Sequence, residues 1–198
     1  MIIGGFIMLI QEMEQYAKEY KVPIMQEEGL SFMLDFIKEH NIKRILEIGS
    51  AIGYSAIRMA MLDDDIHVTT IERDDERYQK ACENLAKSSC QKQIQIYHAD
   101  ALEAVIDGEY DLLFIDAAKA QYQRFFERYE SNLKQGGYII SDNLSFHGYV
   151  EHPEREMSRS LRQLVRKIKN FRLYLESRDD YETKYYELGD GIAVSRKK

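Results

Sequence analysis

From residue 30 onward, short apolar runs alternate with longer helical patterns, and this alternation constrains the fold more than any other feature of the sequence. Short runs rich in Ile, Val and Leu are typical of buried strands. Strands that alternate with helices predict a parallel sheet with helices on both faces, which is the α/β class. The expected strands are residues 44–48, 66–71, 93–97, 111–115 and 138–141, and the expected helices are 30–40, 54–62, 74–87, 120–133 and 153–169.

Two last strands are expected near the end of the chain, at residues 172–176 and 192–195, with no helix between them. A connection without a crossover helix favours an antiparallel orientation for one strand of the pair. The sequence therefore predicts a doubly wound sheet of seven strands, mostly parallel, with one antiparallel strand.

The chain has the composition of a single globular domain spanning residues 1–198, with helices in residues 1–40. Hydrophobic residues make up 44% of it and charged residues 31%, which excludes wholesale disorder. The apolar stretch at residues 1–10 is too short to span a bilayer, so no membrane partner is expected. Met8 is an alternative start to Met1.

Cysteines and charge bear on compartment and partners. Cys82 and Cys90 lack the spacing of a zinc site or a disulfide framework, which favours the reducing cytoplasm. The net charge of −7 argues against indiscriminate nucleic-acid binding. Residues 153–172 nevertheless hold seven basic and two acidic residues, so this segment is basic in an otherwise acidic chain.

Glycines follow the first expected strand, at Gly49 and Gly53 of segment 47–55, where they allow a tight turn and a close approach to a ligand. Their spacing differs from G-x-G-x-x-G and disfavours NAD. Glu72 ends the second strand, where a carboxylate can accept both ribose hydroxyls, and Asp100-Ala101 ends the third, where an adenine edge would lie. The alternative is that the glycines only form turns and that Glu72 is solvated.

Polar side chains also end the fourth and fifth strands, at Asp116 and at Asp142-Asn143. The carboxyl ends of neighbouring parallel strands lie together, so two carboxylates and an amide oxygen should meet there. Such an all-oxygen set suits Mg²⁺, with Mn²⁺ as the other option, rather than Zn²⁺. The alternative is that both aspartates only cap loops.

Together these motifs resemble those of the cation-dependent, catechol-O-methyltransferase-like family of S-adenosylmethionine O-methyltransferases, and the resemblance covers nearly the whole chain. Besides segment 47–55, the motifs are Pro23-Ile24-Met25 with Glu28-Gly29, Ile115-Asp116-Ala117-Ala118-Lys119 with Tyr122, Gly136-Gly137, Asp142-Asn143-Leu144 with Gly148 and Val150, and Gly189-Asp190-Gly191. The resemblance implies a class I methyltransferase fold, which is Rossmann-like, and a homodimer to which the N-terminal helices contribute.

The resemblance also assigns roles to residues. It implies that S-adenosylmethionine is held by Met25, Glu47, Gly49, Ser55, Glu72, Asp100, Ala101 and Asp116. It makes Asp116, Asp142 and Asn143 the metal ligands, and it makes Lys119 the catalytic base beside Asp116. An acceptor with two adjacent oxygens could chelate the metal, which would acidify a hydroxyl for Lys119 to deprotonate. The alternative for Lys119 is a solvated lysine at a helix start.

Four arginines in the last expected helix, Arg155, Arg159, Arg162 and Arg166, are spaced to form one stripe. One interpretation is a phosphate-binding face beside the active site. The other is the solvated side of an amphipathic helix.

The compact chain most resembles the bacterial branch that methylates 5-hydroxyuridine at the wobble position of tRNA to 5-methoxyuridine. The anticodon region of tRNA is therefore the expected partner, since its unpaired base can enter a pocket and offers two adjacent oxygens. A small catechol-type acceptor is the alternative. A non-catalytic module that binds S-adenosylmethionine or RNA is disfavoured by the complete set of metal and base residues.

Overall fold

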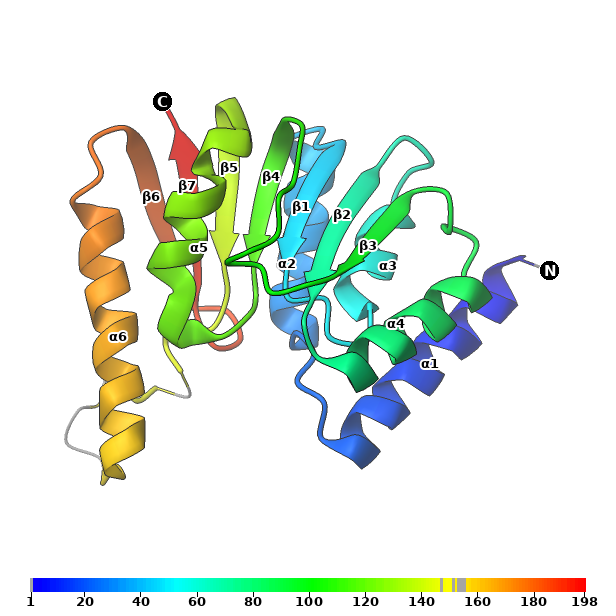
Figure 1. Ribbon diagram of the computed structural model, residues 1–198, viewed down its shortest axis with the longest axis horizontal. Coiled ribbons are helices and arrows are strands. Elements are labelled where there is room, and N and C mark those ends of the chain that lie inside the picture. The colour runs from blue at the N-terminus through cyan, green and yellow to red at the C-terminus, as the bar shows by residue number, and fades with distance from the viewer. Residues whose placement is uncertain (1, 147, 151, 153–155) are drawn as a thin grey trace.

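The computed structural model describes residues 2–146, 148–150, 152 and 156–198, and it shows a seven-stranded sheet between two layers of helices (Figure 1). The strands are β1 (Arg44–Ile48), β2 (His67–Glu72), β3 (Ile94–His98), β4 (Tyr110–Ile115), β5 (Leu133–Ser141), β6 (Tyr181–Tyr186) and β7 (Ile192–Lys197). The helices are α1 (Ile2–Tyr20), α2 (Glu27–Glu39), α3 (Tyr54–Ala60), α4 (Asp75–Lys87), α5 (Tyr122–Tyr129) and α6 (Arg159–Glu176), with 3-10 turns η1 (Lys119–Gln121) and η2 (Glu130–Asn132). Across the described residues, no helix has both the length and the apolar character needed to cross a membrane.

The strands lie in the order β3-β2-β1-β4-β5-β7-β6. β1 pairs in parallel with β2 on one side and with β4 on the other. β7 is antiparallel to both β5 and β6, so it alone among the described strands runs against the rest. The expected sheet of seven strands with one antiparallel member is confirmed. The winding reverses between β1 and β4, where open α/β sheets form ligand crevices beyond the carboxyl ends of their strands.

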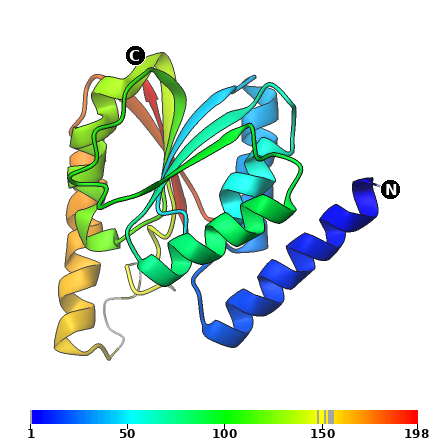
Figure 2. The same cartoon turned by 45° about the vertical axis from the view of Figure 1, so that its right-hand side comes forward.

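Two apolar cores lie on opposite faces of the sheet because successive side chains of a strand point to opposite sides. In β1, Ile45 belongs to the core that includes α1, α2 and α3, and Leu46 belongs to the core that includes α5 and α6. Figures 1 and 2 show α5 and α6 together on one face and α1 running alongside α4. Helices therefore cover both faces, which is why the central strands are apolar throughout rather than alternating.

The prediction of a strand at residues 172–176 is wrong, because these residues form the last turns of α6. Their neighbours Val165, Ile168, Phe171 and Leu175 recur at helical spacing and are buried against the sheet. The strand that pairs with β7 is β6, a more polar segment at the sheet edge.

Two helix boundaries also differ from the prediction. The helix expected from residue 153 begins at Arg159, because the Ser158 hydroxyl accepts the Leu161 backbone N–H at 3.2 Å and caps the first turn. Residues 153–155 lie outside the described chain. The helix expected at 120–133 is divided into η1, α5 and η2, and β5 begins earlier than expected, with its Gly136 inside the strand at φ +74°.

Candidate active site

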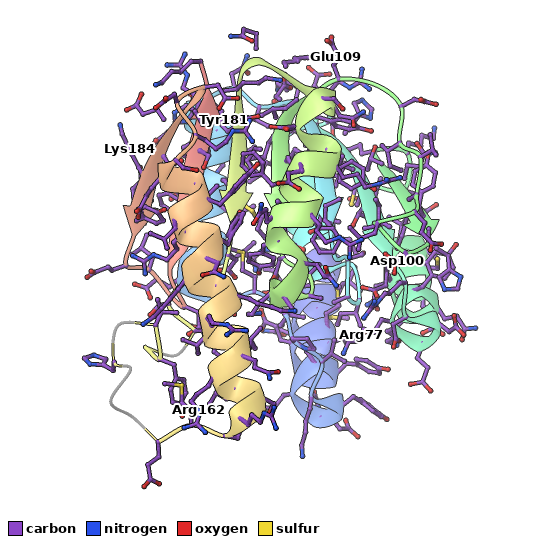
Figure 3. All side chains as sticks on the ribbon, turned by 60° about the vertical axis from the view of Figure 1, so that its left-hand side comes forward. Arg77, Asp100, Glu109, Arg162, Tyr181 and Lys184 are labelled. Carbon is purple, nitrogen blue, oxygen red and sulfur yellow. The ribbon has the colours of Figure 1, made fainter. Side chains whose placement is uncertain are left out.

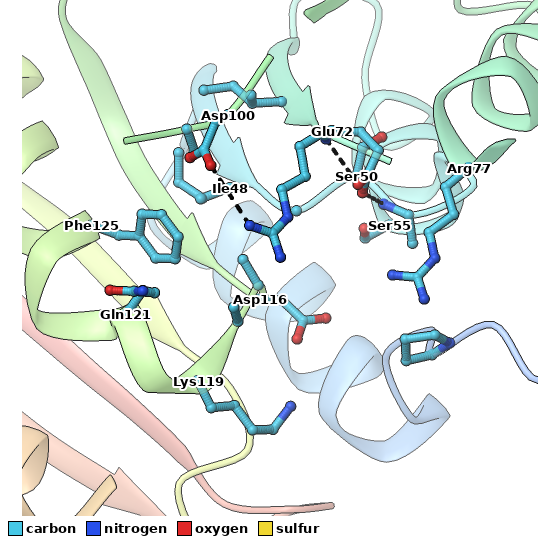
Figure 4. A pocket seen from close by; sticks show the side chains of 18 of the residues that line it. Ile48, Ser50, Ser55, Glu72, Arg77, Asp100, Asp116, Lys119, Gln121 and Phe125 are labelled. Atoms are coloured by element: carbon cyan, nitrogen blue, oxygen red, sulfur yellow. Dashed lines mark hydrogen bonds and ion pairs between the residues drawn. The ribbon is translucent and has the colours of Figure 1, made fainter. Parts of the chain in front are cut away.

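A cavity of about 360 Å³ opens beyond the carboxyl ends of β1, β2, β3 and β4 (Figure 4). Its walls are residues 23–25, 48–51, 71–73, 99–102 and 116–119, with Tyr54, Ser55, Arg77, Gln121 and Phe125. The structure thus brings Met25, Gly49, Ser55, Glu72, Asp100, Ala101, Asp116 and Lys119 to one cavity, as expected from the sequence.

Gly49 allows the ends of β1 and β4 to approach each other. Its φ is +99°, and a Cβ placed there would lie 2.3 Å from the backbone oxygen of Asp116, so only glycine fits without a shift. The next residues turn toward β2, because the N–H groups of Gly49 and Ser50 both donate to the carbonyl of Ile71, at 3.0 and 3.1 Å. The turn places the backbone of the glycine loop along one wall of the cavity.

Glu72 is buried and held by the backbone of two loops. Its Oε2 accepts the Ala51 N–H at 2.8 Å, and its Oε1 accepts the N–H groups of Arg73 and Asp74, both at 2.9 Å. These contacts fix the carboxylate at the cavity wall. On the next strand, Asp100 Oδ1 accepts the Leu102 N–H at 2.8 Å.

Glu47 lies beneath the cavity rather than on its wall. The side chain is fully buried, and it accepts hydrogen bonds from the hydroxyl of Ser55 and from Thr70 Oγ1, the latter at 2.5 Å. Burial raises the pKa of Glu47 to about 7. Direct contact of Glu47 with a cofactor remains a prediction, whereas its support of Ser55, which does line the cavity, is a feature of the structure.

Asp116 and Asp142 lie at the ends of the paired strands β4 and β5, beyond the Ile115–Ser141 pair. Burial raises the pKa of both carboxyls, that of Asp142 to about 7, and the charge of Asp116 adds to the effect on Asp142. Lys119 opposes the shift at both. Asn143 donates from Nδ2 to Asp142 Oδ2 at 2.8 Å. The three expected metal ligands are therefore adjacent and short of positive charge.

Within the described residues, no group of three or more His, Cys, Asp and Glu is placed to hold a metal ion. The expected set is different, since it has two carboxylates and one amide. Such a set is compatible with a hard cation that keeps several waters.

Tyr122 supports this carboxylate pair and was named in the sequence without a role. It is 1% exposed, and its hydroxyl donates to the backbone oxygen of Asp142 at 3.0 Å. Burial, and then the charges of Asp116 and Asp142, raise the pKa of Tyr122 well above its usual range, so the phenol stays a donor. A tyrosine three residues after Lys119 was the only sequence signal.

The Gly189–Asp190–Gly191 motif braces the segment that follows Asn143. The N–H groups of Leu144 and Ser145 donate to the carbonyls of Gly191 and Asp190, at 2.9 and 2.7 Å. A Cβ on Gly191, whose φ is +85°, would lie 2.7 Å from the Ser145 nitrogen. Sequence reasoning did not assign this bracing, which depends on a loop far along the chain.

Two cavity residues were missed altogether, Arg73 and Arg77, which follow Glu72 at the mouth. Arg73 Nη1 lies 3.6 Å from Asp100 Oδ2 (Figure 4). Their spacing of four residues was the available signal.

The arginine stripe lies on α6, apart from the cavity. Arg159, Arg162 and Arg166 are exposed, and Arg155 lies outside the described residues. Figure 3 shows Arg162 near the start of α6. Because α6 contacts η1, the turn that begins with Lys119, the stripe belongs to an element adjoining the site.

The sequence model described as O-methyltransferase matches residues 7–198. The chain is similar to a candidate caffeoyl-CoA O-methyltransferase of Arabidopsis thaliana, with 31% identity over 185 residues that cover 90% of this chain and 78% of the relative. It is 29% identical over 177 residues to a caffeoyl-CoA O-methyltransferase of Stellaria longipes, covering 85% and 72% respectively. A solved structure of a candidate caffeoyl-CoA O-methyltransferase from Staphylococcus aureus superposes with a TM-score of 0.91 at 41% identity, covering 96% and 92%.

Proposed function

The chain belongs to the O-methyltransferase family, and on that premise we propose that it transfers the methyl group of S-adenosylmethionine to one of two adjacent hydroxyls on a small aromatic acceptor. The observation that carries the proposal is a single cavity with two chemically different parts (Figure 4). Glu72 and Asp100 lie in one part, and Asp116 and Lys119 lie in the other.

The first part suits the cofactor. The carboxylate of Glu72, immobilised by three backbone N–H groups, can accept the ribose hydroxyls without reorganising. Asp100 and Ala101 would lie along the adenine, and Met25, which is buried on the opposite wall, would lie near the transferred methyl. The backbone of the Gly49 loop would contact the methionine portion.

The second part suits a divalent cation, most simply Mg²⁺, held by Asp116, Asp142 and Asn143. The fit rests on the donor set: two buried carboxylates raise each other's proton affinity, and Lys119 is the one cation that opposes this effect on both. When bound, the cation would stabilise a phenolate and acidify the acceptor hydroxyl.

The remaining chemistry belongs to the chain. The amine of Lys119, in its neutral form, would take the hydroxyl proton, and the phenolate would then attack the methyl carbon in line with the sulfur. Phe146, whose ring centroid lies 5.8 Å from Lys119 Nζ, would help to keep water from the amine. Because no covalent enzyme intermediate is needed, positioning and electrostatics account for catalysis.

A small acceptor is favoured over RNA by the relatives, whose names place caffeoyl-CoA as their substrate. The second candidate acceptor is 5-hydroxyuridine at the tRNA wobble position. The observation that favours it is the exposed stripe of Arg159, Arg162 and Arg166 on a helix that contacts η1.

The deciding experiment offers labelled S-adenosylmethionine with a catechol panel in one arm and total tRNA in the other, each with and without a chelator. Products are identified by mass analysis of the phenols and of the nucleosides. Turnover of a catechol that stops with chelator supports the proposal. Methylation of hydroxyuridine-containing tRNA alone hands the function to the second candidate, and no turnover of either leaves a binding module.

The two parts of the cavity should separate in variants. Asp142→Ala should abolish metal-dependent turnover and leave cofactor affinity largely intact. Glu72→Ala should weaken cofactor binding by on the order of 2–4 kcal/mol, since two hydrogen bonds to a charged acceptor are lost. Calorimetry with S-adenosylhomocysteine measures both. An equal loss of cofactor affinity in the two variants would contradict this division.

We also propose that the enzyme is a cytoplasmic homodimer in which α1 takes part. Ile7 and Met8 on this helix are 50% and 61% exposed, more than apolar side chains on a lone surface helix require. Both cysteines are free thiols, as expected in a reducing compartment. Light scattering of the wild type and of a Met8→Glu variant measures the dimer.

A further inference from the structure

A second cavity, of about 440 Å³, lies where the sheet ends at β6, and we call it the edge cavity. Its walls come from the segment after β5, from α6, from the end of β6 and from the loop before β7. The side chains that give it chemical character are His152, Arg172, Tyr185, Tyr186 and Glu187. None of them has a part in the methyl-transfer site described above.

The edge cavity has an aromatic wall with a cation beside it. Tyr185 is 36% exposed, and its ring centroid lies 5.0 Å from the guanidinium carbon of Arg172. The Tyr185 hydroxyl donates to the backbone oxygen of Arg172 at 3.2 Å, which fixes the ring. On the other side of the strand, the ring of Tyr186 packs 4.6 Å from that of Phe32. A planar ligand would therefore meet an ordered aromatic surface.

Charge continues from α6 into the edge cavity. Basic residues recur every three or four positions along this helix at Arg159, Arg162, Arg166, Lys169 and Arg172. They form an inclined row that ends in the cavity at Arg172. An anion bound along this row would have its end group at Arg172, while Glu187 offers an acceptor for an N–H group of the ligand.

The inner wall of the edge cavity is joined to the reaction site. Leu144 and Ser145 line the cavity and directly follow Asn143 in the chain. Their N–H groups are bonded to the loop before β7, so this wall has a fixed position relative to Asp142 and Asn143. A ligand seated in the edge cavity could extend along this segment toward the metal ligands.

We propose that the edge cavity binds a nucleotide, with its base against Tyr185, its phosphate facing Arg172 and a base N–H donated to Glu187. The nucleotide would be the distal part of the acceptor, and in this respect the inference rests on the proposed function. Two sources share this chemistry. One is the nucleotide arm of a coenzyme thioester, and the other is a nucleotide that neighbours a modified base in RNA.

The test uses AMP as the probe and the full-length protein saturated with S-adenosylhomocysteine, which blocks the other site that could hold adenine. Calorimetry should detect AMP binding to the wild type. Arg172→Gln and Tyr185→Leu should each weaken it about tenfold, the loss expected for a charge-assisted hydrogen bond and for a stacked base respectively. The matched control is Lys184→Gln, a charge lost from the preceding residue of β6 that lies outside the cavity (Figure 3), and it should change nothing.

Absence of AMP binding to the wild type, or equal binding by Arg172→Gln and Tyr185→Leu, overturns the proposal. Displacement of AMP by coenzyme A identifies the first source, and displacement by a short RNA identifies the second. If neither displaces AMP, the link to the acceptor is wrong. Because binding is measured without turnover, failure here is distinct from failure of the wild type to methylate a catechol.

Discussion

Replacing Tyr122 with Phe tests whether a side chain outside the metal-ligand set controls metal affinity. The substitution removes one hydroxyl and leaves the ring, which packs edge-on against Phe171 at 5.5 Å. The lost hydrogen bond is the 3.0 Å contact to the backbone oxygen of Asp142, in a region where Tyr122 is 1% exposed and Asp142 4%. Loss of a donor to a buried carbonyl costs about 1–3 kcal/mol. For a chain of this size the melting temperature should fall by roughly 2–10 °C.

The same loss should weaken metal binding by about tenfold, the lower end of what support residues around metal ligands contribute, because Asp142 is no longer held at the end of β5. Calorimetry with Mn²⁺ and, separately, with S-adenosylhomocysteine measures the two affinities. Only the first should change.

Tyr110→Phe is the matched control for this variant. Its hydroxyl donates to Thr69 Oγ1 at 3.0 Å and to the backbone of Asp107 at 3.3 Å, at the amino end of β4 and away from the cavity. It should lower the melting temperature without changing metal affinity. Unaltered Mn²⁺ binding by Tyr122→Phe, or an equal loss in Tyr110→Phe, would refute the reasoning.

Three further predictions concern the cofactor loop, the buried acid and the arginine stripe. Gly49→Ala should abolish binding of S-adenosylhomocysteine in calorimetry, because its Cβ would meet the Asp116 oxygen at 2.3 Å. Glu47→Gln should remove a pH dependence: the folded chain holds the Glu47 proton up to about pH 7, whereas the unfolded chain releases it near 4.5, so wild-type stability should fall relative to the variant as pH rises through that window, by on the order of 3 kcal/mol in urea titrations. If tRNA is the acceptor, Arg159→Ala with Arg162→Ala should raise its Michaelis constant and flatten its salt dependence by about one unit of slope per lost phosphate contact.

Each of these three has a clear contrary result. Retained binding by Gly49→Ala would mean that the β1 and β4 ends separate without consequence. Parallel stability curves for Glu47→Gln and the wild type, measured without metal, would show that the buried carboxyl does not retain its proton. An unchanged salt slope for the arginine variant would leave the stripe as a solvated helix face.

The amino-acid sequence by itself determined the central sheet and the order of its chemistry. Local apolar runs such as residues 44–48 are buried on both faces, so their pattern needs no distant partner to be read as a strand. Parallel strands place their carboxyl ends at one edge, so Gly49, Glu72 and Asp116 could be expected in one cavity before any coordinates were known.

Tertiary structure decided what depends on distant contacts. Residues 172–176 are apolar enough for a strand, yet they complete α6 because Phe171 and Leu175 face the core beside β6. Glu47 lies under the cavity because Ser55 and Thr70, from other elements, hold its carboxyl. The edge cavity exists only because the loop before β7 binds the backbone after Asn143, nearly fifty residues earlier in the chain. Side-chain periodicity reports which face a residue presents, whereas such sites are made by segments that meet only when the whole chain has packed.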